Sequence, residues 1–170
     1  LPDKTPLSHG IELDYRHGIF KRHTTWRTAR GNITLVTQRF ASMQTVNAIG
    51  MRFTVSADFH ADVELVTGID CNVWDLNGPH LEQVRMGEAE GDLLVQADTH
   101  EQGIKIAVAE TVLMHYPMEK KQVVTDKKIV HRIFFITKPG ETYTTEKWIG
   151  IYTGRDCANP EEQALKCVRD

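Results

Sequence analysis

The sequence has no long apolar run, no surplus of one charge and no secretion signal. No apolar stretch approaches the roughly 20 residues that a membrane helix needs, and the first residues lack a basic segment followed by an apolar one. The 20 basic and 23 acidic residues give a formal net charge of −3, and the basic residues are spread along the chain. We therefore expect a soluble protein without a membrane or nucleic-acid partner.

Cysteine is also scarce. Cys71, Cys157 and Cys167 form no CxxC pair, and their odd number fits a reduced intracellular chain better than a disulfide framework. We expect a cytoplasmic location. A chain of 170 residues can bury about two thirds of its unfolded surface in a single core, so it needs neither a metal nor a disulfide to fold.

Familiar catalytic and ligand-binding motifs are missing. The eight histidines form no HxH or HxxxH pair, which predicts no metal site. No GxSxG turn and no glycine-rich turn leading into a helix are present, which argues against a nucleophilic triad and a nucleotide site. The carboxylates of Asp70, Asp75 and Glu110 remain, and we interpret them as solvated or hydrogen-bonded acids.

Short alternating segments separated by turns predict an antiparallel β-sandwich of about ten strands. In the segment 104–113, small Ala107 and Ala109 lie opposite an apolar face, as expected where another layer approaches closely. The segment 129–136 is apolar on both faces, so we expect it to be buried on both sides. The predicted strands are residues 11–15, 19–28, 33–40, 45–55, 63–67, 82–86, 93–97, 104–113, 123–124, 129–136 and 143–152.

The end of the chain has a helical pattern instead. Asn159 suits a helix cap, and Pro160 suits the first helical position. Ala164, Leu165 and Val168 then fall on one face. We predict a short C-terminal helix that starts near Pro160 and packs its apolar face against another element.

The stretch Gly68–Leu81 is the part of the chain most typical of a functional loop. Sugar sites combine an aromatic platform with carboxylates and amides, because a pyranose has an apolar face and a polar rim. The stretch supplies such a mixture within a few residues. The candidate substrate or interface residues are Asp70, Trp74, Asp75, Asn77 and His80. The alternative interpretation is a capped turn whose tryptophan plugs the sandwich.

Several motifs resemble the N-terminal domain of glycoside hydrolase family 65. They are Gly18–Arg27 (GIFKRHTTWR), Thr37–Met43 (TQRFASM) and Gly68–Asp70 (GID), in this order along the chain. The run Val73–His80 (VWDLNGPH) is most similar to the kojibiose and nigerose phosphorylase branch. The resemblance covers nearly the whole chain.

The resemblance implies an all-β antiparallel super-sandwich, similar to galactose mutarotase, that precedes a catalytic (α/α)6 barrel. Residues 1–156 would form the sandwich and residues 157–170 the start of the helical linker. The parent enzyme would cleave an α-glucosidic disaccharide with inorganic phosphate as co-substrate, with inversion to β-glucose 1-phosphate. The family's general acid and phosphate-binding residues belong to the barrel, so no catalytic residue is carried over to this chain.

The resemblance also implies a departure, because the glycine-rich strands that normally precede Leu1–Pro2 are missing. We therefore expect a piece of a longer protein with an unpaired strand edge, and self-association as a homodimer through that edge. Two other functions stay open. One is a free-standing carbohydrate-binding module, and the other is a mutarotase-like enzyme that pairs Glu110 with His115 or His131.

Overall fold

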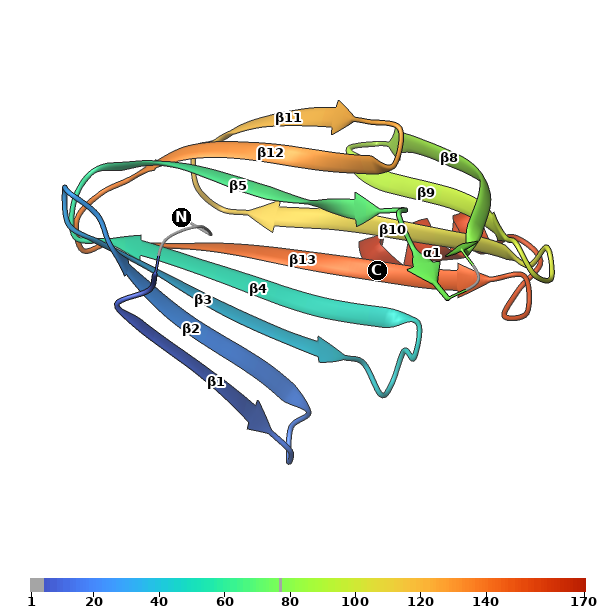
Figure 1. The fold of residues 1–170 in the computed structure, drawn as a ribbon, viewed down its shortest axis with the longest axis horizontal. Coiled ribbons are helices and arrows are strands. Elements are labelled where there is room, and N and C mark those ends of the chain that lie inside the picture. The colour runs from blue at the N-terminus through green and yellow to red at the C-terminus, as the bar shows by residue number, and fades with distance from the viewer. Residues whose placement is uncertain (1–4, 77) are drawn as a thin grey trace.

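An eight-stranded antiparallel sheet, sheet A, extends across the molecule in the computed structural model, which describes residues 5–76 and 78–170 (Figure 1). In spatial order its strands are β1 (Ser8–Asp14), β2 (Ile19–Arg27), β3 (Asn32–Ala41), β4 (Ala48–Ala57), β13 (Thr142–Thr153), β10 (Lys105–Met114), β9 (Asp92–Thr99) and β8 (Leu81–Ala89).

A second antiparallel sheet, sheet B, lies over part of sheet A (Figure 1). Its strands in spatial order are β11 (Glu119–Val124), β12 (Lys128–Thr137) and β5 (Ala61–Asp70). The two sheets form the predicted all-β antiparallel sandwich, so the predicted fold class is confirmed. A two-stranded hairpin, β6 (Trp74–Asp75) with β7 (Gly78–Pro79), follows β5.

Alternation along the strands places the core between the sheets. Ile129, Ile133 and Phe135 of β12 are buried against sheet A, whereas Ile136 is 62% exposed. The prediction that residues 129–136 are buried on both sides is therefore wrong. The physical reason is that the outer face of β12 meets no other layer within the described part of the chain.

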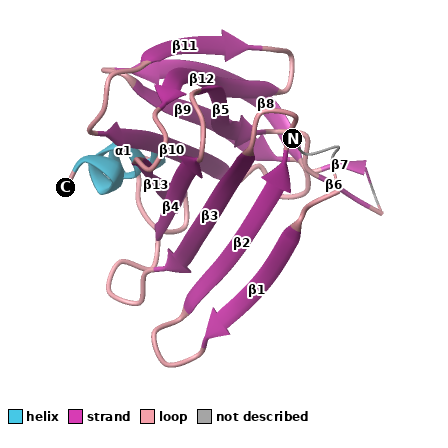
Figure 2. Ribbon diagram, turned by 90° about the vertical axis from the view of Figure 1, so that its left-hand side faces the viewer, coloured by secondary structure: helices cyan, strands magenta, loops and turns pink. Residues whose placement is uncertain are grey.

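The predicted helix is present as α1 (Pro160–Arg169), and it packs on the face of sheet A opposite sheet B (Figure 2). Ala107 and Ala109 lie buried under it, as their small size predicted. At Gly150 a Cβ atom would lie 2.7 Å from the carbonyl oxygen of Ala164, so only glycine fits this close contact.

Asn159 takes the cap position of α1, but its side chain does not hydrogen-bond to the first helical amides, so the expected side-chain cap is wrong. Pro160 supplies the first helical position, which needs no amide donor. Within residues 5–76 and 78–170, no helix combines the length and the apolar character needed to cross a bilayer.

Sheet A is wider than sheet B. Both views show β1, β2 and β3 projecting beyond the three strands of sheet B (Figures 1 and 2). β1 is an edge strand on which Ile11 and Leu13 are 62% and 48% exposed. Homodimerisation through this edge stays a prediction.

Candidate functional site

The loop between β5 and β8 is more ordered than its sequence indicates. β5 continues to Asp70, and the loop then folds into the β6–β7 hairpin, with Trp74 opposite Pro79 and Asp75 opposite Gly78. Gly78 has a φ of +114°, which favours glycine. The predicted site residue Asn77 lies outside the described residues, and the side chain of Asp75 is also not described.

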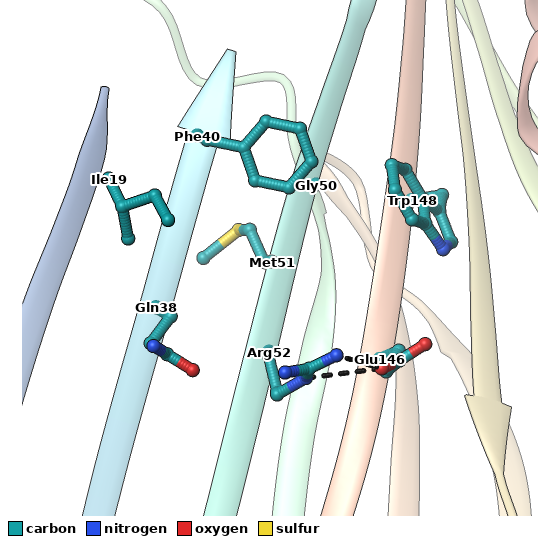
Figure 3. Close-up of a pocket in the computed structure, with 8 residues that line it drawn as sticks. All are labelled: Ile19, Gln38, Phe40, Gly50, Met51, Arg52, Glu146 and Trp148. Atoms are coloured by element: carbon teal, nitrogen blue, oxygen red, sulfur yellow. Dashed lines mark hydrogen bonds and ion pairs between the residues drawn. The ribbon is translucent and has the colours of Figure 1, made fainter. Parts of the chain in front are cut away.

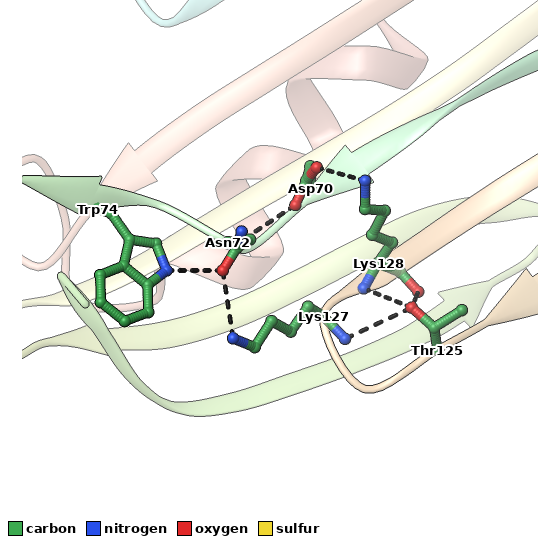
Figure 4. Close-up of polar contacts among 6 residues, drawn as sticks. All are labelled: Asp70, Asn72, Trp74, Thr125, Lys127 and Lys128. Carbon is green, nitrogen blue, oxygen red and sulfur yellow. Dashed lines mark hydrogen bonds and ion pairs between the residues drawn. The ribbon is translucent and has the colours of Figure 1, made fainter. Parts of the chain in front are cut away.

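Asp70 holds the start of this loop (Figure 4). One carboxylate oxygen accepts a hydrogen bond from the backbone N–H of Asn72 at 2.9 Å, and the other lies 2.8 Å from the Nζ of Lys128. The hydrogen bond from Lys128 lowers the pKa of Asp70 below its usual value. The carboxylate therefore stays ionised and positions the chain after β5.

Trp74 is held by its polar edge while its ring stays open to solvent. Its Nε1–H donates to the Oδ1 of Asn72 at 2.7 Å, and the Nζ of Lys127 donates to the same oxygen at 3.2 Å (Figure 4). The same Nζ lies 5.6 Å from the centre of the Trp74 ring. Trp74 is 58% exposed, so the alternative in which it plugs the sandwich is wrong.

Two histidine–carboxylate pairs join the loop and the start of β8 to the turn after β9. The Nδ1 of His80 lies 2.8 Å from the Oε1 of Glu101, and the Nδ1 of His100 contacts the Oε1 of Glu82. The backbone N–H of His100 also donates to the carbonyl oxygen of His80 at 2.8 Å. The hydrogen bond to Glu82 raises the pKa of His100 above its usual value.

A pocket of about 390 Å³ opens below this loop, between the ends of the two sheets. Asp70, His80, Thr99 and Glu101 supply its polar lining. Burial raises the pKa of the Cys71 thiol, which is one of its apolar neighbours, so the thiol stays neutral. The apolar lining residues are Ile69, Cys71, Val73, Leu81, Val95, Ala97, Ile106 and Val108.

The loop thus brings Asp70 and His80 to one pocket, as their sequence proximity suggested, and leaves Trp74 exposed beside it. Sequence reasoning missed the lining from β9 and β10, because those strands follow the loop by many residues. Val95 and Ala97 share one face of β9, and Ile106 and Val108 share one face of β10. This pattern predicts that each strand buries one face, but it does not identify the pocket that the two strands line.

Of the residues considered for a mutarotase-like enzyme, Glu110 and His131 lie in the core, whereas His115 is exposed. Glu110 and His131 are each 1% exposed. Glu110 lies 2.7 Å from the Nζ of Lys147 and accepts a hydrogen bond from Thr67 at 2.8 Å. A sugar cannot reach these groups without opening the sandwich, so the geometry does not support this chemistry. No group of three or more metal-ligating side chains occurs among residues 5–76 and 78–170.

Comparison with known proteins gives the family. The model of the glycosyl hydrolase family 65 N-terminal domain matches residues 1–170. The nigerose phosphorylase of Lachnoclostridium phytofermentans is 30% identical over 99% of this chain and 25% of that protein. The kojibiose phosphorylase of Escherichia coli is 27% identical over 91% of this chain and 22% of that protein.

A solved structure assigned as a kojibiose phosphorylase from the human microbiome has the same fold. Its TM-score is 0.86 at 14% sequence identity, and the match covers 95% of this chain and 22% of that one. The chain spans about a quarter of the length of the relatives that it matches. Because the family model matches the chain from end to end, this protein belongs to glycosyl hydrolase family 65, as an N-terminal domain of that family.

Proposed function

We propose that this chain is the noncatalytic N-terminal domain of a phosphorylase that acts on α-glucosidic disaccharides. The observation that carries the proposal is the family match over residues 1–170, together with relatives named as phosphorylases of which the chain spans only about a quarter. The catalytic barrel would follow the linker that begins in residues 157–170. Inorganic phosphate would be the co-substrate, and the location would be cytoplasmic.

In the parent enzyme, an acid of the barrel would protonate the glycosidic oxygen while phosphate attacks C1 of the glucosyl unit from the opposite face. The bond between C1 and the glycosidic oxygen breaks as the bond between C1 and a phosphate oxygen forms, so the anomeric centre inverts to β-glucose 1-phosphate. This reaction requires no nucleophile from the sandwich. The role left to this domain is to shape the active site or the dimer.

We place the loop that carries Asp70, Trp74 and His80 at the boundary with the barrel. An exposed indole offers a large rigid contact area at low entropic cost, and such rings are common anchors in protein interfaces. The pocket beside it is lined mainly by apolar side chains and has polar groups in Asp70 and His80. An apolar centre with a polar margin is typical of a surface that another domain covers.

The test is the Trp74→Ala substitution in the full-length enzyme. We expect kcat/KM for phosphorolysis to fall about tenfold, as one lost aromatic contact of ~1.4 kcal/mol predicts. Tyr15→Ala is a matched control, because Tyr15 is 89% exposed and lies after β1, outside the loop. Wild-type kinetics for Trp74→Ala, with normal stability, would remove the loop from the account.

A free-standing carbohydrate-binding module is the second candidate function. The exposed ring of Trp74 next to the polar groups of Asp70 and His80 favours it, since sugars stack on aromatic rings and hydrogen-bond to such groups. Saturable binding of a disaccharide that depends on Trp74, by the 170-residue chain alone, would support this candidate. Its absence would leave the domain role.

A further inference from the structure

An amphipathic strip crosses the face of sheet A on which α1 packs, because Trp148 of this strip also packs against the helix. Figure 3 shows its side chains. Strand register aligns two rows of side chains across β3, β4 and β13. In the apolar row Phe40 lies opposite Gly50, and Gly50 lies opposite Trp148. In the polar row Gln38 lies opposite Arg52, and Arg52 lies opposite Glu146. We call these six residues the outer strip.

The apolar row is a fixed aromatic platform. The rings of Phe40 and Trp148 meet edge to face, with centroids 5.8 Å apart and an interplanar angle of 83°. Gly50 leaves the space for this contact, because a Cβ atom there would lie 2.5 Å from the Phe40 ring and 3.0 Å from Trp148. Phe40 is 37% exposed, so part of the platform faces solvent.

The polar row presents hydrogen-bonding groups next to that platform. The Nε and Nη2 of Arg52 donate to the Oε1 of Glu146 at 3.1 and 2.6 Å. Both bonds use the same oxygen, which leaves the Oε2 of Glu146 to accept from a ligand hydroxyl. The Arg52 and Glu146 side chains are 53% and 33% exposed, and Gln38 adds an amide to the row.

The geometry points to a binding site for a pyranose ring of a neutral glucoside on the outer strip. The apolar face of the pyranose would stack on the Phe40 ring, and the perpendicular Trp148 ring would contact the side of the sugar. The sugar hydroxyls would hydrogen-bond to Gln38, Arg52 and Glu146. The charges of Arg52 and Glu146 balance, so the strip does not favour an anion such as phosphate.

The space available fits a small ligand. The pocket over the strip has a volume of about 130 Å³, and adjacent strands lie ~4.8 Å apart, so three strands give a platform about 10 Å long. Trp148 also lines a pocket of about 610 Å³ next to α1. A second sugar unit can therefore extend past Trp148 toward the helix.

The test uses the 170-residue chain and calorimetric titration with methyl α-glucoside, maltose, kojibiose and nigerose at millimolar concentrations. We expect saturable binding by the wild-type chain. Phe40→Ala and the isosteric Glu146→Gln should each lower the association constant about tenfold, the effect of one contact of ~1.4 kcal/mol. Gly50→Ala should also weaken binding, since its Cβ displaces the Phe40 ring. Tyr15→Ala is the control that should bind normally.

Two results would overturn the inference. One is the absence of saturable binding by a wild-type chain whose circular dichroism shows the folded sandwich. The other is binding that Trp74→Ala abolishes and Glu146→Gln leaves unchanged, which would assign the sugar to the loop. Glu146→Gln keeps the size of the side chain at a partly exposed position, so this variant should fold. It can therefore test the inference even if Phe40→Ala does not fold.

The choice of glucosides as ligands rests on the proposed function, but the site itself and its test do not. The proposed function is tested by turnover of the full-length enzyme after a change in the loop. The outer strip is tested by binding to the 170-residue chain after a change on the opposite side of sheet A. Failure of one test therefore leaves the other proposal standing.

Discussion

Two lysine–carboxylate pairs in this domain have almost the same geometry but lie in opposite surroundings. Lys147 and Glu110 lie 2.7 Å apart between the sheets, with side chains 9% and 1% exposed. Lys128 and Asp70 lie 2.8 Å apart at the start of the loop, with side chains 54% and 51% exposed. The distance alone therefore says little about what each pair contributes.

Burial decides the difference. An exposed ion pair gains little electrostatic free energy, because water and salt screen the attraction between the two charges. Many such pairs therefore add nothing measurable to stability. A buried pair has lost its hydration, so each charge depends on its partner and on nearby hydrogen bonds. Thr67 supplies these bonds, because its hydroxyl donates to Glu110 at 2.8 Å and accepts from Lys147 at 3.0 Å. Stability thus depends on the buried pair, whereas the exposed pair is free to serve a surface role.

The largest expected effect comes from breaking the buried pair. Lys147→Met leaves the carboxylate of Glu110 without its partner in the core, and we expect a loss of about 3–5 kcal/mol in the free energy of unfolding. Lys128→Met is the matched exposed control and should leave the urea midpoint unchanged. The measurement is equilibrium urea unfolding followed by tryptophan fluorescence.

A double variant sharpens the same comparison. Glu110→Leu combined with Lys147→Met replaces both charges with apolar groups, so stability should return close to that of the wild type. A double variant as unstable as Lys147→Met alone would mean that packing, not the unpaired charge, causes the loss. Equal effects of Lys147→Met and Lys128→Met would contradict the role given to burial.

The next effect is a dependence on pH. His131 is 1% exposed, and its Nε2 lies 3.8 Å from the Oε2 of Glu88, which is too long for a hydrogen bond. Burial lowers the pKa of His131, and Lys120 lowers it further, whereas Glu88 and Glu110 act in the opposite direction. The neutral ring is therefore the form that the folded sandwich favours.

Below the ordinary histidine pKa of about 6.5, the unfolded chain binds a proton that the folded chain binds less readily. Folding stability should therefore be complete above pH ~6.5 and decline as the pH falls below that value. Urea unfolding from pH 8 to pH 5 measures the decline. His131→Leu should make this dependence shallower, and an unchanged slope in that variant would remove His131 as its cause.

The strands were predictable because alternation is a local property. Small Ala107 and Ala109 even indicated the face that α1 covers. The prediction failed at residues 129–136, since an apolar residue such as Ile136 can remain exposed on an outer sheet. Sequence pattern shows which residues share a face, but not whether a further layer lies on that face.

The candidate site was predictable only in part, for the same reason. The loop residues lie close together in sequence, so their grouping could be foreseen. The burial of Lys147 could have been foreseen, because Lys147 shares one face of β13 with Tyr143 and Thr145, but its pairing with Glu110 could not. The register that places Lys147 near Glu110 depends on the pairing of β10 with β13, which no local pattern specifies.

The smallest expected loss of stability is at the exposed loop, for the substitution of Trp74. Trp74 is 58% exposed, and its contacts are the hydrogen bond to Asn72 and the position of Lys127 over its ring. Trp74→Ala in the 170-residue chain should therefore cost no more than ~1 kcal/mol, as for other exposed aromatic contacts. Ile133→Ala, at a fully buried position, should cost about 2–5 kcal/mol in the same urea experiment. A loss for Trp74→Ala that matches that of Ile133→Ala would mean that the ring supports the fold, and its exposed face would then no longer argue for a contact with another domain or a sugar.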